Sequence, residues 1–137
     1  EIAADHLAFV QRRIESPPDQ SPTDRLTCFF TAGFAFIESF PARGRLIVNA
    51  VYGPVAEYRA RVYQAYEPMF TLIARDILEV GIARGDFQAV NTDVITALIM
   101  SIYLGACSQF DSSGKIWLDP QKVVRFILDG LRGCHTA

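Results

Sequence analysis

Histidine and cysteine are the side chains of this chain that could carry out nucleophilic or acid–base chemistry. The sequence has two histidines, His6 near its start and His135 near its end. Neither belongs to a recognisable serine–histidine–aspartate arrangement. Cys134 adjoins His135, but a fraying chain end does not hold a nucleophile and a base in a fixed geometry. The sequence therefore predicts no catalytic residues, and we expect that the protein is not an enzyme.

Metal and phosphate chemistry also lack their usual patterns. No spacing of His, Cys or Glu suits zinc, and no Glu-x-x-His pair of the di-iron type is present. Gly81, Gly85 and Gly105 are interpreted as helix-end or packing residues, not as a phosphate loop. The carboxylates Glu57 and Glu79 fall on a solvated stripe, which is a poor place for acid–base catalysis. We expect neither a metal ion nor a cofactor.

The three cysteines predict a reduced protein. Cys28, Cys107 and Cys134 are odd in number and widely spaced, so they do not form a disulfide framework. Cys28 and Cys107 lie in apolar runs and are interpreted as small core residues, with redox sensing as the alternative. We expect a cytoplasmic location, where thiols stay reduced.

The start of the chain and its most apolar stretch predict neither a signal peptide nor a membrane span. The first residues lack the basic region and apolar region of a signal peptide, and they already follow a helical pattern without an initiator methionine. We therefore expect a fragment that something precedes. The stretch from Val94 to Phe110 is nearly uncharged but short and contains Thr96 and Ser101, so we interpret it as a buried helix.

Composition predicts one folded domain with a large core. Of the 137 residues, 50% are hydrophobic and 20% are charged, which excludes a disordered chain. The net charge of −2 lacks the basic excess with which a DNA-binding domain neutralises phosphates. Arginines that could suggest a nucleic-acid patch are diluted by nearby acids and are interpreted as solvated surface: Arg12, Arg13, Arg43 and Arg45.

Helical periodicity and helix punctuation predict an all-α bundle of about six helices, and no hairpin signal interrupts them. The first helix is expected over residues 2–15, before prolines 17 and 18. Its buried face is expected to hold Ala3, Leu7, Val10 and Ile14. The other helices are expected at 21–40, 45–52, 54–84, 91–110 and 119–132.

Local signals fix several of these helix ends. Ser21, Asn91 and Asp119 are expected N-caps, and a left-handed glycine, Gly85, is expected to end the fourth helix. Residues 41–44, Pro-Ala-Arg-Gly, are expected to separate the second and third helices. Pro68 predicts a kink within the fourth helix. The second helix carries phenylalanines in nearly every direction, so it should be enclosed on most sides.

The last two helices predict a homodimer. The helix that contains residues 94–110 has no substantial polar face, and the final helix has only a narrow polar stripe. Two such helices from each of two subunits would bury this surface in a two-fold symmetric four-helix bundle. The alternative is that the pair is central in a monomeric bundle. The expected interface residues are Leu98, Ile102, Gly105, Ala106, Val123, Phe126, Ile127, Gly130 and Leu131.

The order and spacing of several motifs resemble a known family. The run from Tyr66 to Phe87 is similar to a long helix that ends in G-x-x-x-G-x-F/L, and Asn91-Thr92-Asp93 is similar to an Asp-rich helix start. Asp119-Pro120 followed by Ile127-Leu128-Asp129-Gly130-Leu131 resembles a closing D-P…L-L-x-G-L pattern. Together they resemble the C-terminal domain of TetR-family transcriptional regulators, most closely from Arg45 to Arg132.

This resemblance implies that residues 1–137 form one effector-binding and dimerisation domain. In that family an N-terminal helix-turn-helix domain binds operator DNA, and a ligand in the C-terminal domain changes the separation of the two DNA-binding heads. The sequence lacks that head, so operator DNA is expected as a partner only through the missing N-terminal domain. Residues 2–15 resemble the helix that connects the two domains.

The resemblance also implies a pocket for a small, mostly apolar effector between the second, fourth and fifth helices. Tyrosines would supply both apolar area and hydrogen bonds for such a ligand. The alternative is that the aromatic residues fill the core. The candidate ligand-binding residues are Phe30, Phe34, Ile37, Tyr58, Tyr66, Met69, Phe70 and Tyr103. Two other functions stay open: a helical dimer that acts in protein interaction without a ligand, and a small helical enzyme without an obvious motif.

Overall fold

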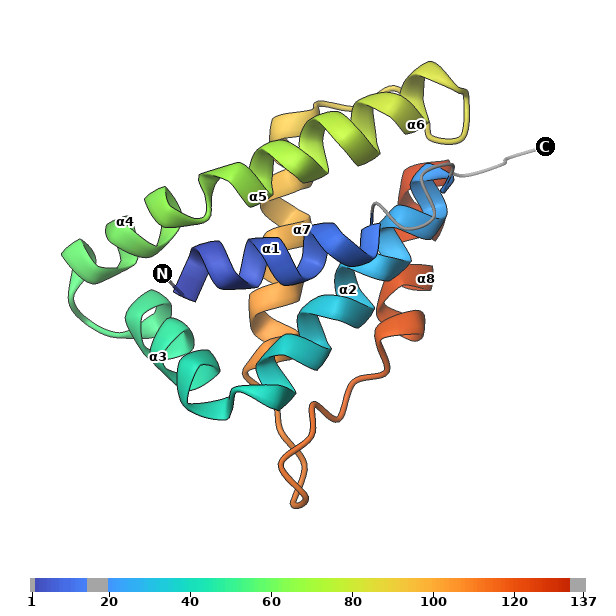
Figure 1. The fold of residues 1–137 in the computed structure, drawn as a ribbon. Coiled ribbons are helices and arrows are strands. Elements are labelled where there is room, and N and C mark those ends of the chain that lie inside the picture. Colours follow the sequence, from blue (N-terminus) through green and yellow to red (C-terminus); the bar gives the residue numbers. More distant parts are fainter. Residues whose placement is uncertain (1, 15–19, 134–137) are drawn as a thin grey trace.

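The computed structural model describes residues 2–14 and 20–133, and over these residues the protein is an all-α bundle (Figure 1). This confirms the predicted fold class. The helical segments are α1 (Ile2–Ile14), α2 (Pro22–Ser39), α3 (Pro41–Tyr52), α4 (Ala56–Ala65), α5 (Glu67–Thr71), the π-helical η1 (Leu72–Glu79), α6 (Val80–Ala83), α7 (Thr92–Cys107) and α8 (Pro120–Arg132). The loop between α7 and α8 projects from the bundle (Figure 1) and contains an isolated bridge between Phe110 and Ile116.

The predicted N-caps are confirmed. Ser21 Oγ accepts a hydrogen bond from the backbone N–H of Asp24, and Asn91 Oδ1 accepts from those of Asp93 and Val94. Asp119 Oδ1 caps α8 in the same way, by accepting from the N–H of Gln121. Each side chain satisfies backbone donors that the first turn of a helix leaves free.

Two details of the predicted helices differ in the structure. The predicted face of α1 packs against the core, with Val10 and Ile14 buried and Ala3 and Leu7 half-buried, but it also includes the buried His6, which the pattern did not predict. Residues 41–44 do not separate α2 from α3, because Pro41 occupies the first turn of α3. Proline suits that position, since the first N–H groups of a helix have no partner within it.

The fourth predicted helix is a bent arm that consists of α4, α5, η1 and α6 (Figure 1). Its break lies at Tyr66, which has φ −93° and ψ 5°, two residues before Pro68. This confirms the predicted kink, because proline lacks an N–H and its ring collides with the carbonyl four residues earlier. Gly85, with φ 80°, ends the arm as predicted.

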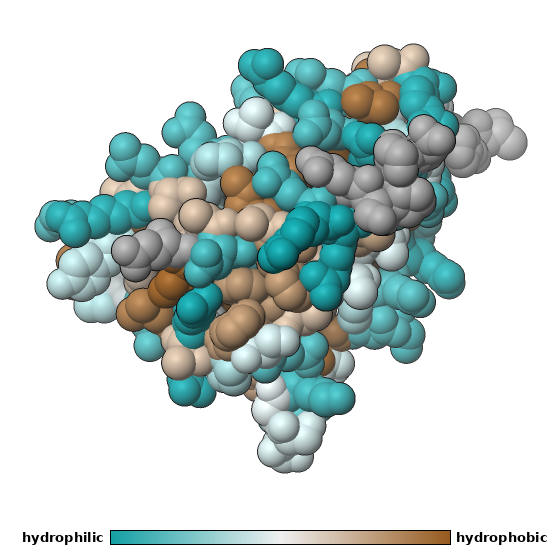
Figure 2. Space-filling view, in the orientation of Figure 1, coloured by the Kyte–Doolittle hydropathy of each residue, from teal (hydrophilic) through white to brown (hydrophobic). Residues whose placement is uncertain are grey.

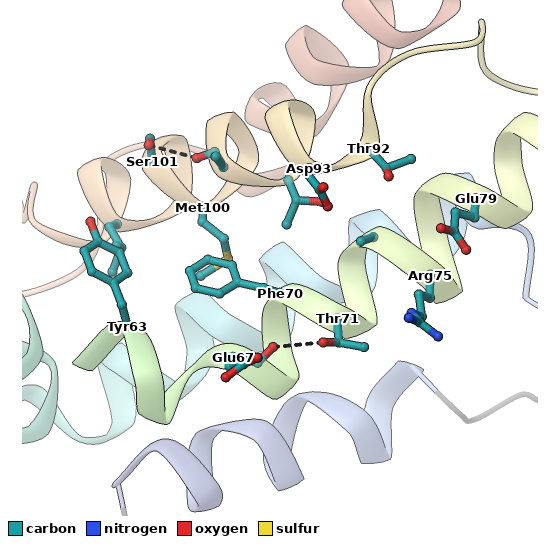
Figure 3. A pocket seen from close by; sticks show the side chains of 14 residues that line it. Tyr63, Glu67, Phe70, Thr71, Arg75, Glu79, Thr92, Asp93, Met100 and Ser101 are labelled. Atoms are coloured by element: carbon teal, nitrogen blue, oxygen red, sulfur yellow. Dashed lines mark hydrogen bonds between the residues drawn. The ribbon is translucent and has the colours of Figure 1, made fainter. Parts of the chain in front are cut away.

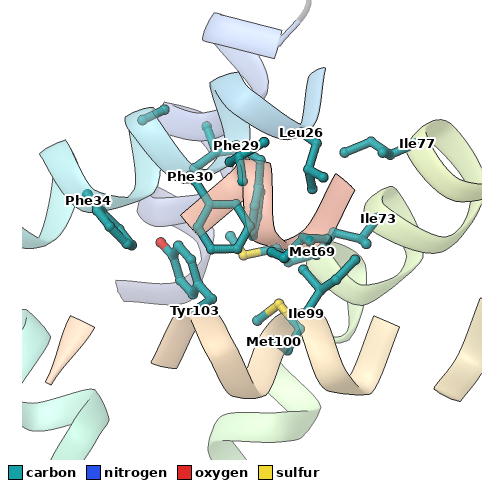
Figure 4. Close-up of a cluster of buried hydrophobic side chains, with 14 of the residues drawn as sticks. Leu26, Phe29, Phe30, Phe34, Met69, Ile73, Ile77, Ile99, Met100 and Tyr103 are labelled. Carbon is teal, nitrogen blue, oxygen red and sulfur yellow. The ribbon is translucent and has the colours of Figure 1, made fainter. Parts of the chain in front are cut away.

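Helix α2 lies at the centre of the core, with α1, α8 and the arm packed around it. Its phenylalanines Phe29 and Phe30 are fully buried, and they meet Met69 and Ile73 from the arm and Tyr103 from α7 (Figure 4). This agrees with the predicted enclosure of α2.

One glycine of α2 sets how closely α7 can approach. A Cβ atom at Gly33 would collide with the ring of Tyr103, so the close contact between α2 and α7 at this point requires glycine. Tyr103 in turn packs against Phe29, with ring centroids 4.9 Å apart. The aromatic core and the glycine are therefore matched in shape.

The surface is mostly polar on the face that carries α1, and apolar side chains interrupt it near α2 and α3 (Figure 2). Phe40, between α2 and α3, and Leu46 of α3 are large exposed apolar residues, 40% and 60% exposed. Every helix within residues 2–14 and 20–133 is too short or too polar to span a lipid bilayer.

Candidate functional site

A groove of about 610 Å³ lies between the arm and α7 and is here called the large groove (Figure 3). Apolar side chains and charged or hydroxyl side chains are interspersed along its lining. The apolar residues are Tyr63, Phe70, Ala74, Ala97, Met100 and Leu104. The polar residues are Glu67, Thr71, Arg75, Glu79, Thr92, Asp93, Thr96 and Ser101.

Helical spacing explains this mixed lining. On the arm, the lining residues recur every three or four positions from Tyr63 to Glu79, and on α7 they do so from Thr92 to Leu104. Two helical stripes therefore face each other across the groove. Part of the arm stripe lies in η1, a π-helical segment, and such segments are frequent at functional sites.

A second, much smaller cavity of about 20 Å³ lies beside the large groove. His6 of α1, Ile37 of α2 and Cys107 of α7 are among its lining residues, and it is almost entirely apolar. Tyr63, Phe70, Met100 and Leu104 line both this cavity and the large groove. These four side chains form a shared layer between the groove and the interior of the domain.

A buried polar group, here called the His6 cluster, consists of His6, Tyr66 and Tyr103. His6 is 1% exposed; its Nδ1 lies 2.9 Å from the hydroxyl of Tyr66, and its Nε2 lies 2.6 Å from the hydroxyl of Tyr103. Its ring stacks on Phe36 with centroids 4.3 Å apart. The cluster thus joins α1 to the arm and to α7.

Burial controls the protonation of the cluster. Desolvation lowers the pKa of His6 from 6.5 to about 4, so the imidazole is neutral at neutral pH. A neutral imidazole donates through one nitrogen and accepts through the other, so one tyrosine accepts from His6 and the other donates to it. Burial also raises the pKa of both tyrosine hydroxyls and of the Cys107 thiol.

This arrangement suits positioning and not proton transfer. Both nitrogens of His6 are engaged, and the tyrosines and Cys107 stay protonated at neutral pH. The sequence reasoning missed the cluster. A signal was available, because His6 precedes Val10 and Ile14 by four and eight positions, which places a polar residue on an apolar face.

The structure divides the predicted ligand-binding residues among several environments. Phe70 lines the large groove, and Ile37, Tyr66, Phe70 and Tyr103 line the small cavity. Phe30, Phe34 and Met69 are packed in the core, at most 2% exposed. Tyr58 lies on α4, which has no buried residue, and is 55% exposed. The groove itself lies between the arm and α7 and has no lining residue from α2.

The predicted dimer residues also fall into two sets. Leu98 and Phe126 are 54% and 74% exposed, Ile102 and Val123 are half-buried, and a Cβ atom at Gly105 or Gly130 would meet no neighbour. These six residues are here called the α7–α8 face. Ala106, Ile127 and Leu131 are instead buried in the core of their own subunit.

The other sequence-level candidates lie apart from the groove or outside the described residues. Cys28 is half-buried and Cys107 is buried, while Cys134 and His135 lie outside the described residues. Among residues 2–14 and 20–133, no three His, Cys, Asp or Glu side chains gather in a way that could hold a metal ion.

Comparison of the chain with family models, with curated proteins and with solved structures gave no match. The assignment of a function therefore depends on the residues and on the geometry described above.

Proposed function

We propose that this chain is the effector-sensing and homodimerisation domain of a TetR-type transcriptional regulator, and that its effector is a small, mostly apolar molecule. The observation that carries the proposal is the large groove. Its volume of about 610 Å³ lies within the range of small-molecule sites, and its apolar lining with scattered polar groups is typical of them.

The position of α1 supports a switching role for this groove. A ligand in the groove contacts the shared layer of Tyr63, Phe70, Met100 and Leu104, and the His6 cluster lies on the other side of the small cavity that this layer also lines. Movement of these four side chains therefore alters the two hydrogen bonds that hold His6 between Tyr66 and Tyr103. A preference of about 1–3 kcal/mol for one position of α1 suffices for a regulatory switch.

The α7–α8 face supports the homodimer. Leu98 and Phe126 expose large apolar side chains, and Ile102, Val123 and Phe126 line a shallow groove of about 390 Å³ with Trp117. Large exposed apolar side chains gathered on one surface are typical of an interaction surface, and Asp119 and Lys122 at the same groove would form its polar rim. In the proposed regulator, a helix-turn-helix domain that precedes residue 1 binds operator DNA. Residues 1–137 themselves bind no DNA.

The ligand-binding part is tested with a thermal-shift screen of small molecules on the wild type and on Ala97→Phe, which fills the groove. We expect some compounds to stabilise the wild type by about 2.7 kcal/mol at about 100 times their Kd, and to leave the variant unchanged. Ala60→Phe, on an exposed position of α4 that does not line the groove, is the matched control. Compounds that stabilise all three proteins equally would show that the groove is not their site.

The dimer part is tested by sedimentation equilibrium at micromolar concentration. We expect a dimer for the wild type and a monomer for Phe126→Glu, because a carboxylate cannot be buried unpaired at an interface. Leu46→Glu, at a position of α3 that is 60% exposed against 74% for Phe126, is expected to remain a dimer. A monomeric wild type contradicts this part of the proposal. The regulator part fails if the reading frame ahead of residue 1 encodes no helix-turn-helix domain.

A further inference from the structure

The charges along the large groove are unbalanced. Glu67, Glu79 and Asp93 contribute three carboxylates, and Arg75 contributes the one positive charge among the described lining residues. Glu79 and Asp93 come from facing helices near one end of the groove, and Glu67 lies towards the end that holds Tyr63 (Figure 3). With three carboxylates and one guanidinium, the lining carries a formal net charge of −2.

This negative charge is not neutralised from within the described part of the chain. The ion pairs found there join Arg43 to Asp5, Arg61 to Glu57, and Arg84 to Asp86, and none of these residues lines the groove. The low-dielectric apolar wall beside the carboxylates strengthens their field inside a concave site. The groove therefore favours a positively charged occupant.

The apolar side of the groove is suited to the rest of such an occupant. The rings of Tyr63 and Phe70 stack with centroids 6.2 Å apart, and Met100 and Leu104 continue the apolar wall. Aromatic faces attract cations as well as apolar groups. Thr96, which also lines the groove, is 4% exposed, and its Oγ1 finds no hydrogen-bond partner among the described residues. This leaves one buried hydroxyl that the protein itself does not satisfy.

We propose that the large groove binds an amphipathic organic cation. Its aromatic or aliphatic body lies against Tyr63, Phe70, Met100 and Leu104, and its ammonium, amidinium or phosphonium group lies near Glu79 and Asp93. The volume of about 610 Å³ suits a molecule of drug size. This inference rests on the proposed function, because it specifies the chemical class of the effector.

The charge preference is tested with two ions of the same shape and opposite charge, tetraphenylphosphonium and tetraphenylborate, by calorimetry in a sodium buffer of low ionic strength. Neutral triphenylphosphine oxide is the third probe. We expect the phosphonium to bind at least about tenfold more tightly than either other probe, and its affinity to fall as salt screens the carboxylates.

Variants of opposite sign locate this preference in the groove. Glu79→Gln and Asp93→Asn are each expected to weaken phosphonium binding about fivefold, the size expected for a solvent-exposed ion pair, and Arg75→Gln is expected to strengthen it similarly. Asp76→Asn is the matched control, because Asp76 is an exposed carboxylate of the same segment η1 that does not line the groove. It is expected to leave the affinity unchanged.

The outcomes separate this inference from the proposed function. Tighter binding of the borate or the neutral probe, or an equal response to Asp76→Asn and Glu79→Gln, overturns the cation class. If Ala97→Phe abolishes the binding of the borate or the neutral probe, the groove remains the effector site although its ligand is not a cation. Failure of the phosphonium to bind while compounds from the thermal-shift screen do bind in the groove also overturns the cation class alone. Absence of any groove ligand contradicts both proposals.

Discussion

The His6 cluster and the large groove both involve the arm and α7 but differ in how completely side chains fill them. Around His6, Tyr66 and Tyr103, side chains leave a cavity of only about 20 Å³, whereas the adjoining groove measures about 610 Å³. Aromatic residues close the first region from three helices. Charged residues, which favour a hydrated environment, are among those that line the second. The dense aromatic packing around His6 therefore stabilises the fold. The arm residues from Tyr63 to Glu79, several of which are polar, form one wall of the candidate site.

The largest expected effect of this difference is on core stability. Tyr103→Ala removes a ring that packs on Phe29 and leaves His6 Nε2 without its partner. We expect the free energy of unfolding to fall by about 4 kcal/mol, measured by urea denaturation. Tyr103→Phe keeps the ring and is expected to cost only about 1–2 kcal/mol. Equal losses for the two variants would mean that the hydrogen bond to His6, and not the packing of the ring, dominates.

The next effect is a pH dependence that belongs to His6. Its pKa is lowered by burial from 6.5 to about 4, so the unfolded chain binds a proton in this window that the folded protein does not. The contribution of His6 to the free energy of unfolding is therefore fully present above pH 6.5. It is lost as the pH falls towards 4, by about 3 kcal/mol in total.

The measurement is urea denaturation of the wild type and of His6→Phe at about pH 7 and about pH 4.5. We expect the wild type to lose more stability than the variant on acidification. Asp111, whose pKa is lowered by hydrogen bonds from Ser113 and Lys115, also makes the fold less stable at low pH, but equally in both proteins. Parallel pH profiles would show that His6 is not held neutral.

The smallest effect on stability is expected in the groove. Glu79→Gln and Arg75→Gln change exposed side chains without an ion-pair partner in the described residues, so each should alter the free energy of unfolding by at most about 0.5 kcal/mol. Urea denaturation of the two variants checks this. A loss comparable to that of Tyr103→Phe would mean that these charges hold the fold together, which would remove the contrast between the two regions.

Much of the fold could be predicted because local signals determine it. Ser21, Asn91 and Asp119 each satisfy backbone donors within three residues, and Pro68 interrupts the arm through its own ring. The enclosure of α2 followed from the density of its phenylalanines. These features depend on neighbours in the sequence, so no knowledge of tertiary contacts was needed.

The site could not be predicted to the same degree because it depends on the packing angle of distant helices. Phe30, Phe34 and Met69 have the same chemical character as Phe70, yet only Phe70 lies at the groove. Tyr58 was expected in the pocket, but it lies on α4, which has no buried residue, and it is 55% exposed. The partners of His6 are 60 and 97 positions away, so nothing local could identify them.

Hydrogen–deuterium exchange with and without a saturating ligand tests the central claim most directly. The ligand is tetraphenylphosphonium or, if that does not bind, a compound from the thermal-shift screen. We predict slower exchange in η1 and in the α7 residues that line the groove, a smaller change in α1 through the His6 cluster, and no change in α8. Protection confined to the α7–α8 face, or spread evenly over the core, would contradict the assignment of the groove as the effector site.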